Sequence, residues 1–429
     1  MKRIVLQSGA DMTRVALLED ELVMEFDMDR PLERQQAGSV YLGRVVNVLP
    51  GMQAAFVDIG LEKNAFLYID DLLPAHLEKQ PAVKPSITEL VKPGQTLIVQ
   101  VDKEPSGTKG ARVTTHYSLP GRWLVYMPQA SYVAVSRKIE PDNEKRRLKT
   151  LGEQMRQGDE GIILRTVSAG QSVEALLGDL SLLREKWQAV LAAAQTAKAP
   201  SLLYRDADLL QRTFRDLIRQ DVDDIVVDSA AAADKLRELL LPHAAESVPL
   251  IRVHDGAAPI FEAYGVNEQL EKAFRRKVWL PSGGYLIVDQ TEALTVVDVN
   301  TGKYTGTVAL EETVLHINLE AADAIARLLR LRNIGGIVIV DFIDMAEDAN
   351  RSAVLARMTE AVNRDRIKTN VVGWTKLGLL ELTRRKSRDN WSELFIQTCS
   401  HCQGKGRMMP ELDETEPRPA AAQAVKLEK

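Results

Sequence analysis

Aspartates stand at the ends of two apolar segments of this sequence. In "LTVVDVN", Asp298 and Asn300 are two positions apart, and in "GGIVIVDFIDM" a β-branched run leads directly into Asp341, with Asp344 three residues later. Two carboxylates that lie close together repel each other, so one stays protonated unless a cation lies between them. Mg²⁺ held by one or two carboxylates and several waters removes this conflict, and it can orient a water for attack on a phosphodiester. These residue types make a Mg²⁺ site one candidate, and phosphodiester hydrolysis is the chemistry that such a site would supply.

The segments around the aspartates predict strands and helices in an order that would bring the aspartates together. These elements are expected over 283–300 (a hairpin), 308–332 (a helix with one apolar stripe), 337–344 (a strand) and 350–364 (a helix). A strand, a helix and a second strand imply a right-handed crossover between parallel strands. The carboxyl ends of parallel strands lie at one edge of a sheet, so we expect Asp298, Asn300 and Asp341 to meet there.

Other interpretations of these residues stay open. The β-branched run at 337–340 predicts a strand that is buried on both faces. If this strand continues, Asp344 points to the face opposite Asp341 and acts at most in support of the site. Alternatively, Asp298 caps a turn and Asp341 merely ends a strand.

Composition excludes several classes of protein. The chain has 429 residues and a net charge of −5, so we expect several domains and no uniformly basic surface. It contains no run of about 18 apolar residues, which predicts no membrane-spanning segment. Its two cysteines argue against a disulfide framework and indicate a reducing compartment, so a cytoplasmic location is expected. Residues 409–429 are low in complexity and are predicted to be disordered.

Short strands separated by turn residues predict a small β-barrel over about 38–115, after two N-terminal strands that form a hairpin. Phe56 and Phe66 are ten residues apart on what should be neighbouring strands, and Lys109 follows in a later segment. Aromatic side chains stack on bases and cations follow the backbone of single-stranded nucleic acid. The alternative is that both phenylalanines belong to the barrel core.

Cys399 and Cys402 form a C-x₂-C pair in "CSHCQGKG". Such a pair presents two thiolates to a tetrahedral Zn²⁺, and His401 between them is poorly placed to bind the same ion. Because the chain has no other cysteine, a second copy would complete a Cys₄ site across a two-fold axis. A redox role is disfavoured, since the pair follows helical sequence and precedes glycines.

Three motifs together resemble the catalytic domain of the ribonuclease E/ribonuclease G family. They are "VVDVNTG", "NLEAADAIARLLRLRNIGGIVIVDFIDM" and "TCSHCQGKGR", and the "DVNTG" turn is closer to the ribonuclease G branch. The resemblance covers nearly the whole chain, because the predicted barrel and the unit after it match in order. It implies an α/β multidomain fold with an inserted OB-type S1 barrel, an α/β catalytic core with a parallel strand–helix–strand unit, and a zinc-link.

The resemblance also implies a role for individual residues. Asp298 and Asp341 match the aspartates that hold the catalytic Mg²⁺, and Asn300 matches the asparagine that helps to place the attacking water. Phe56, Phe66 and Lys109 match residues that face RNA. Cys399 and Cys402 match zinc ligands shared between two chains.

Arg165 and Thr166 in "GIILRTVSAG" match the pocket that senses a 5′-monophosphate, with support from Arg137. An arginine fork can take a phosphate bidentately, and a neighbouring hydroxyl can donate one more hydrogen bond. Without the resemblance, Arg165 would be an ordinary surface arginine. A pocket filled by a monophosphate predicts that a triphosphate end is a poor activator.

The resemblance divides the chain into units. They are 1–35 with 203–275 (a supporting, RNase H-like domain), 36–117 (the S1 RNA-binding domain), 118–202 (the 5′-end sensor domain), 276–397 (the catalytic domain), 398–408 (the zinc-link) and 409–429 (the tail). Ribonuclease E members carry a further small domain after the zinc-link that joins dimers into tetramers. Because only low-complexity sequence follows here, we expect a homodimer, and the sequence gives a tetramer no support.

The leading hypothesis is a Mg²⁺-dependent endoribonuclease of RNA processing and decay, including rRNA maturation and mRNA turnover. It would cut single-stranded RNA to leave a 5′-phosphate and a 3′-hydroxyl. The first alternative is a non-catalytic S1-type RNA-binding protein, which gains nothing from two anions placed near RNA phosphates. The second is a metal phosphohydrolase acting on DNA or small phosphoesters, which the barrel disfavours.

Overall fold

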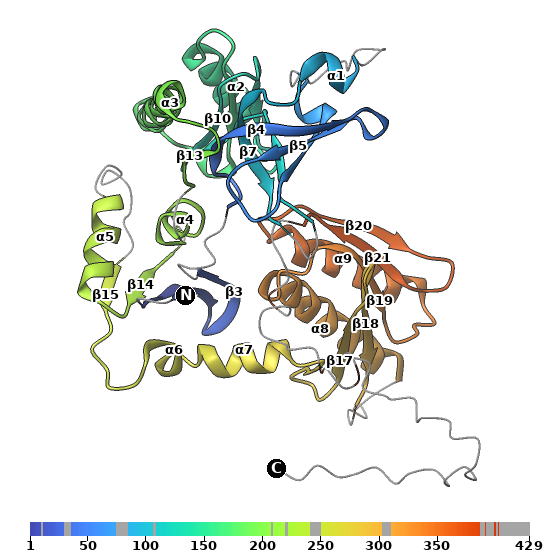
Figure 1. The fold of residues 1–429 in the computed structure, drawn as a ribbon. Coiled ribbons are helices and arrows are strands. Elements are labelled where there is room, and N and C mark those ends of the chain that lie inside the picture. The colour runs from blue at the N-terminus through green and yellow to red at the C-terminus, as the bar shows by residue number, and fades with distance from the viewer. Residues whose placement is uncertain are drawn as a thin grey trace, which may run out of the picture.

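The computed structural model contains four β-sheets and the helices that cover them (Figure 1). The described residues are 1–9, 12–29, 36–73, 85–105, 109–206, 209–218, 222–240, 250–302, 310–386, 391, 399 and 402.

The first sheet combines the N-terminus with a segment more than two hundred residues away in the sequence. Its strand order is β15 (Leu250–Val253), β14 (Asp224–Val227), β1 (Lys2–Ser8), β2 (Thr13–Glu19) and β3 (Leu22–Asp29). The predicted N-terminal hairpin is present, since β1 pairs antiparallel with β2, but its second predicted strand is in fact two strands, β2 and β3. Asp20 and Glu21 both have positive φ, at 49° and 62°, which is the backbone of a tight two-residue turn.

Helices cover both faces of this first sheet. They are α4 (Leu209–Asp216) and α5 (Ala230–Leu240), which share one core with Ile4, Leu6 and Ile225, and α6 (Ile260–Ala263) and α7 (Val266–Phe274), which pack on the other face. The second core is continuous with that of the fourth sheet.

The second sheet closes into the predicted barrel. Its strands are β4 (Val40–Leu49), β5 (Ala54–Asp58), β6 (Ala65–Tyr68), β8 (Arg112–Thr114) and β7 (Thr96–Lys103), with the short helix α1 (Ile87–Leu90) in the connection before β7. The pairing of β4 with β7 closes the circle, and β13 (Ser201–Tyr204) adds to the other side of β4. The closed five-stranded arrangement is consistent with the predicted OB-type fold.

The third sheet belongs to the segment after the barrel. Its order is β11 (Val133–Val135), β12 (Gly161–Leu164), β10 (Leu124–Met127) and β9 (Leu119–Pro120). Two helices pack against it through one hydrophobic core, α2 (Asp142–Met155) and the long α3 (Val173–Thr196).

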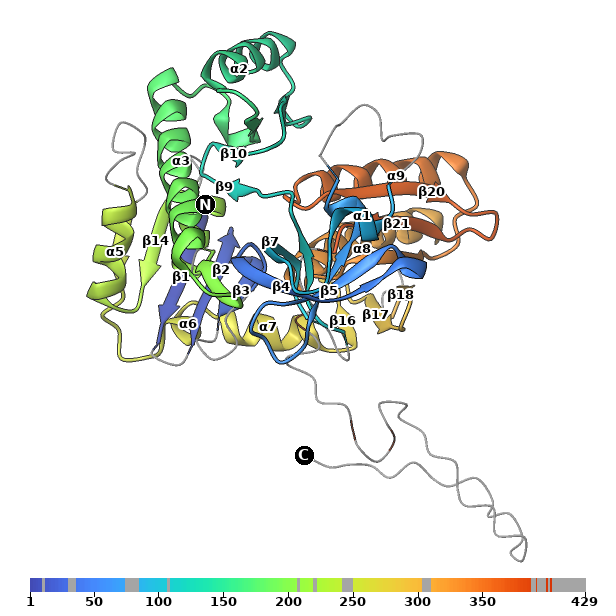
Figure 2. The same cartoon turned by 45° about the horizontal axis from the view of Figure 1, so that its top comes forward.

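The fourth sheet carries the predicted catalytic residues. Its order is β16 (Lys277–Trp279), β17 (Tyr285–Gln290), β18 (Leu294–Asn300), β19 (Gly336–Asp341), β21 (Leu380–Arg384) and β20 (Thr369–Trp374). The pair β18–β19 is parallel, as the order of strand, helix and strand predicts. The helices α8 (Leu310–Leu331) and α9 (Asp348–Asn363) pack together against this sheet (Figure 2).

The prediction that residues 337–340 are buried on both faces is wrong. Val338 and Val340 are fully buried against the helices, whereas Ile337 on the other face is 47% exposed. The reason is that α8 and α9 cover one face of the sheet only, so β19 alternates between a buried and an open side.

Among the described residues, no helix combines the length and the apolar character needed to cross a membrane.

Candidate active site

Asp298 and Asp341 are direct neighbours at the ends of two parallel strands. Asp298 is the cross-strand partner of Asp341, next to the buried pair formed by Val297 and Val340. Residues opposite each other on neighbouring strands point to the same face. Both carboxylates therefore lie on the open face of the sheet, and both are exposed.

The electrostatics of Asp341 reflect this crowding. Partial burial, and then the negative charges of Asp298 and Asp344, raise the pKa of Asp341 above its ordinary value. The condition for placing Asp344 on the opposite face is not met, because β19 ends at Asp341 and the alternation of the strand does not continue. Three acids thus contribute to one negative region.

Asn300 is held toward the same carboxylates. Its amide Nδ2 donates a hydrogen bond of 2.8 Å to Oδ2 of Asp298. The turn after it requires glycine at Gly302, whose φ is +61° and where a Cβ would lie 2.3 Å from the carbonyl oxygen of Gly283. This close packing fixes the end of β18 and so the direction of Asn300.

The donor set fits a divalent cation with few protein ligands. Across the described residues, no group of three or more His, Cys, Asp or Glu side chains is arranged to hold a metal ion. Mg²⁺, however, is commonly held by one or two carboxylates and keeps several waters. Asp298 and Asp341 provide two such carboxylates, and a cation between them would relieve their mutual repulsion.

The barrel presents its two phenylalanines on its outer surface. Phe56 and Phe66 are cross-strand partners, and their ring centroids are 6.0 Å apart in an edge-to-face arrangement. The barrel core is built from the residues directly next to them in sequence, such as Ala55, Val57 and Leu67, so the interpretation of these rings as core is wrong.

Basic residues accompany this aromatic pair. Lys109 is exposed, and the glycine after it packs so closely on Asn64 that a Cβ would lie 2.1 Å from the Asn64 carbonyl oxygen. Arg112, which sequence reasoning missed, is the cross-strand partner of Phe66 on the outer face and pairs with Asp71 at 2.8 Å. The alternation of apolar and polar residues in "ARVT" is the sequence signal that could have placed Arg112 on the outer face.

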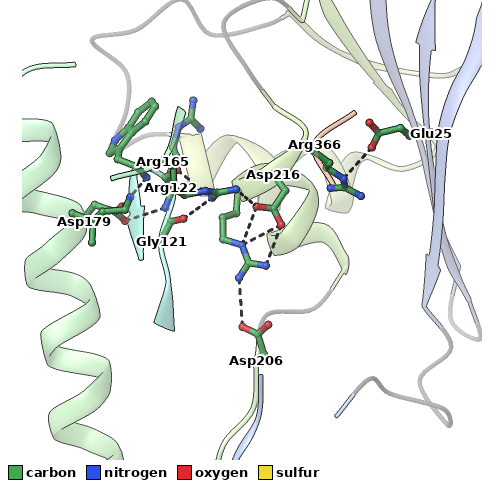
Figure 3. Close-up of polar contacts among 11 residues, drawn as sticks. Glu25, Gly121, Arg122, Arg165, Asp179, Asp206, Asp216 and Arg366 are labelled. Carbon is green, nitrogen blue, oxygen red and sulfur yellow. Dashed lines mark hydrogen bonds and ion pairs between the residues drawn. The ribbon is translucent and has the colours of Figure 1, made fainter. Parts of the chain in front are cut away.

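Arg165 is anchored rather than loosely exposed (Figure 3). Its Nη1 donates to the carbonyl oxygens of Gly121 at 2.8 Å and Arg122 at 3.2 Å, and its Nη2 pairs with Asp216 at 2.7 Å. The Arg165 side chain is 27% exposed, so it still faces solvent. Asp216 comes from α4, a distant element that sequence reasoning did not connect with Arg165.

The other predicted sensor residues lie beside Arg165. Strands β11 and β12 run parallel, and Oγ1 of Thr166 lies 2.8 Å from Oγ of Ser136. Ser136 directly precedes Arg137, and both Thr166 and Arg137 are exposed. The geometry therefore places an arginine, a hydroxyl and a second arginine on neighbouring segments.

The two cysteines fall at the edge of the described part of the chain. Cys399 is exposed and Cys402 is half-buried, while His401, the rest of the predicted zinc-link and the tail lie outside the described residues.

Comparison with known proteins agrees with this arrangement. A model described as the ribonuclease E/G family matches residues 118–387. Ribonuclease G of Haemophilus influenzae is 44% identical over 403 residues, which cover 92% of this chain and 82% of the relative. Ribonuclease G of Escherichia coli K12 is 43% identical over 401 residues, with the same coverage. Ribonuclease E of Nostoc is 43% identical over 393 residues, but only 57% of that longer protein is covered. This chain belongs to the ribonuclease E/G family.

Proposed function

We propose that this endoribonuclease of RNA processing cleaves single-stranded RNA with the help of Mg²⁺ held by Asp298 and Asp341. The observation that carries the proposal is the direct pairing of these two aspartates on the open face of the sheet. Mg²⁺, when bound, would supply a positioned water and stabilise the negative charge that develops on the cleaved phosphate. The products are a 5′-phosphate and a 3′-hydroxyl.

The protein's own residues prepare this site. Nδ2 of Asn300 donates to Asp298, which turns Oδ1 of Asn300 to the side where it can accept a hydrogen bond from the attacking water. Asp344 adds negative charge near Asp341 and thereby favours a cation at the strand ends. Gly302 packs against the carbonyl oxygen of Gly283, which holds the end of β18 and with it Asn300 in place.

The barrel binds the RNA strand in this proposal. Phe56 and Phe66 offer ring surface to bases on the outer face of the barrel, and Lys109 contacts the phosphates. Stacking accepts any base, because every base has an aromatic face, so this contact provides affinity rather than sequence specificity.

Arg165, Thr166 and Arg137 bind a 5′-monophosphate end and stimulate cleavage. The anchoring of Arg165 by Gly121, Arg122 and Asp216 supports this role, since an oriented fork loses less side-chain entropy when it binds phosphate. Equal cleavage of 5′-monophosphorylated and 5′-triphosphorylated RNA would contradict this part of the proposal.

Two chains form a dimer in which Cys399 and Cys402 of each contribute to one Zn²⁺ site. Support comes from the spacing of the pair and from its being the only two cysteines of the sequence.

The decisive assay uses 5′-monophosphorylated single-stranded RNA with Mg²⁺ or with a chelator. We expect wild type to cleave only with the metal ion, and Asp298→Asn to lose cleavage but still bind RNA. Asp234→Asn, which changes an exposed acid on α5, is the matched control and should cleave normally. Cleavage that survives both chelation and Asp298→Asn refutes the metal proposal, whereas binding without any cleavage by wild type indicates a non-catalytic RNA-binding protein.

A further inference from the structure

An exposed aromatic cluster lies at the β16–β17 edge of the fourth sheet, the sheet that carries Asp298 and Asp341. Trp279 is 57% exposed, and its ring contacts Tyr285 with centroids 5.3 Å apart and an interplanar angle of 64°. Nζ of Lys277 lies 4.1 Å from the Trp279 ring centroid and 3.6 Å from that of Tyr285. Because Trp279 is this exposed, its burial contributes little to the stability of the fold, and its ring surface is available to a ligand.

Strand register places this cluster beside the predicted catalytic residues. Trp279 pairs with Tyr285, and Tyr285 pairs with Asn300. In the neighbouring row, Lys277 pairs with Ile287, which pairs with Asp298.

The cluster and the aspartates also share one face of the sheet. The alternate residues Leu286 and Val299 are buried in the helix-covered core, so the residues between them point to the open side. Neighbouring strands are about 4.8 Å apart, which puts the cluster roughly 10 Å from the paired aspartates. This is close enough for RNA that crosses the aspartates to reach it.

We propose that Trp279 and Tyr285 form a stacking platform for a nucleotide base next to the cleaved phosphate, and that Lys277 contacts the RNA backbone beside it. The inference rests on the proposed function and adds a binding subsite on the catalytic sheet itself. Aromatic rings bind unpaired bases, and a nearby ammonium group binds phosphate.

A second copy of this chain fits the cluster less well than RNA does. Lysine is depleted in protein–protein interfaces, and here Lys277 lies on both rings. The cluster is also continuous, through Tyr285 and Asn300, with the site at which RNA is cut in the proposed reaction.

The test combines protein variants with RNA that lacks single bases. A 5′-monophosphorylated oligonucleotide with one cleavage site is prepared with an abasic residue at each position in turn near the cut. For wild type, we expect kcat/KM to fall about tenfold at one such position, the size of a lost base–aromatic stack. Trp279→Ala should lose about tenfold on the intact RNA and show no further loss on that abasic RNA, while Trp279→Phe keeps most of the rate.

A control variant and a second platform variant separate stacking from damage to the fold. Leu377→Ala removes another apolar side chain from the same sheet, one that is 86% exposed in the turn between β20 and β21, and it should leave all rates unchanged. Tyr285→Ala provides a second, independent variant of the platform and should show the same insensitivity to the abasic position.

The outcomes are distinct. The platform is refuted if Trp279→Ala matches wild type on all RNAs, or if it slows cleavage while keeping the abasic sensitivity of wild type. A halved molar mass of Trp279→Ala by light scattering, with unchanged abasic sensitivity, would assign the cluster to a contact between copies and also refute the proposal. Metal-independent cleavage by wild type would instead refute the proposed function, so the two failures can be told apart.

Discussion

Asp216 is expected to control the response to the 5′ end, although it lies on a helix outside the third sheet. Its carboxylate accepts from Nη2 of Arg165 at 2.7 Å and from Nη2 of Arg215 at 3.1 Å, and its side chain is only 20% exposed. Asp216→Ala removes the anion that two guanidinium groups share. Because the site is partly exposed, we expect a loss of about 2–3 kcal/mol in the free energy of unfolding, below the ~3–5 kcal/mol of a fully buried pair.

The effect on 5′-end sensing follows from the same contact. Without Asp216, Arg165 keeps its bonds to Gly121 and Arg122 but loses the anchor on Nη2. A charge-assisted hydrogen bond contributes about 1.5–3 kcal/mol, so the kcat/KM advantage of 5′-monophosphate over 5′-hydroxyl RNA should fall roughly tenfold or more. If the advantage in wild type is itself less than about tenfold, it should disappear. Asp216→Asn keeps one acceptor and should retain part of the advantage.

The assay measures both RNAs at a temperature where circular dichroism shows every variant folded. Asp206→Ala is the matched control, since Asp206 pairs with Arg215 at 3.5 Å and, within the described part of the chain, forms no hydrogen bond or ion pair with Arg165 (Figure 3). We expect this control to lose stability but keep the 5′-monophosphate advantage. The reasoning is refuted if Asp216→Ala keeps the full advantage, or if Asp206→Ala loses it equally.

Further predictions concern RNA binding, pH and zinc. Phe66→Ala should raise KM for single-stranded RNA about tenfold with little change in kcat, measured by steady-state kinetics, because stacking contributes ~1–3 kcal/mol per base; an unchanged KM would return this ring to a structural role. Burial acts to raise the pKa of Asp216, but the charges of Arg215 and Arg165 outweigh it, so the pKa lies below its ordinary value. This carboxylate therefore stabilises the fold above its unfolded pKa of about 3.9, and denaturant titrations should show stability falling as pH drops below about 4, less steeply in Asp216→Ala. Cys399→Ser should lower the zinc content from one ion per two chains and halve the molar mass seen by light scattering; a zinc-free wild-type dimer would contradict the shared site.

The meeting of the two aspartates could be predicted from the sequence because it depends on topology alone. A strand, a helix and a strand give parallel neighbours, and the register then pairs Asp298 with Asp341. The β-branched run at 337–340 could not show which face is covered, since burial depends on helices packed from elsewhere in the chain. The position of Asp344 likewise depended on where β19 ends, and strand ends are poorly specified by pattern.

Other features needed long-range contacts that pattern does not contain. The pattern predicts that Phe56 and Phe66 lie on neighbouring strands, but that they pair on the outer face follows only from the register of β5 with β6 and from the burial of their sequence neighbours in the barrel core. The turn at Asp20 and Glu21 lacks the usual glycine or asparagine, so it gave no turn signal. The ion pair of Arg165 with Asp216 joins residues 51 positions apart, one directly after β12 and the other on α4, and neither residue is unusual in its own segment.

The central claim is that Asp298 and Asp341 hold one divalent ion together, and metal binding tests it most directly. Mn²⁺ can replace Mg²⁺ as a paramagnetic probe, and its binding is followed by electron paramagnetic resonance on wild type, Asp298→Asn, Asp341→Asn and the double variant. If the two carboxylates share the ion, each single variant loses this binding and the double variant binds no more weakly than either. Retained Mn²⁺ affinity in both single variants, or losses that simply add in the double variant, would contradict a shared ion.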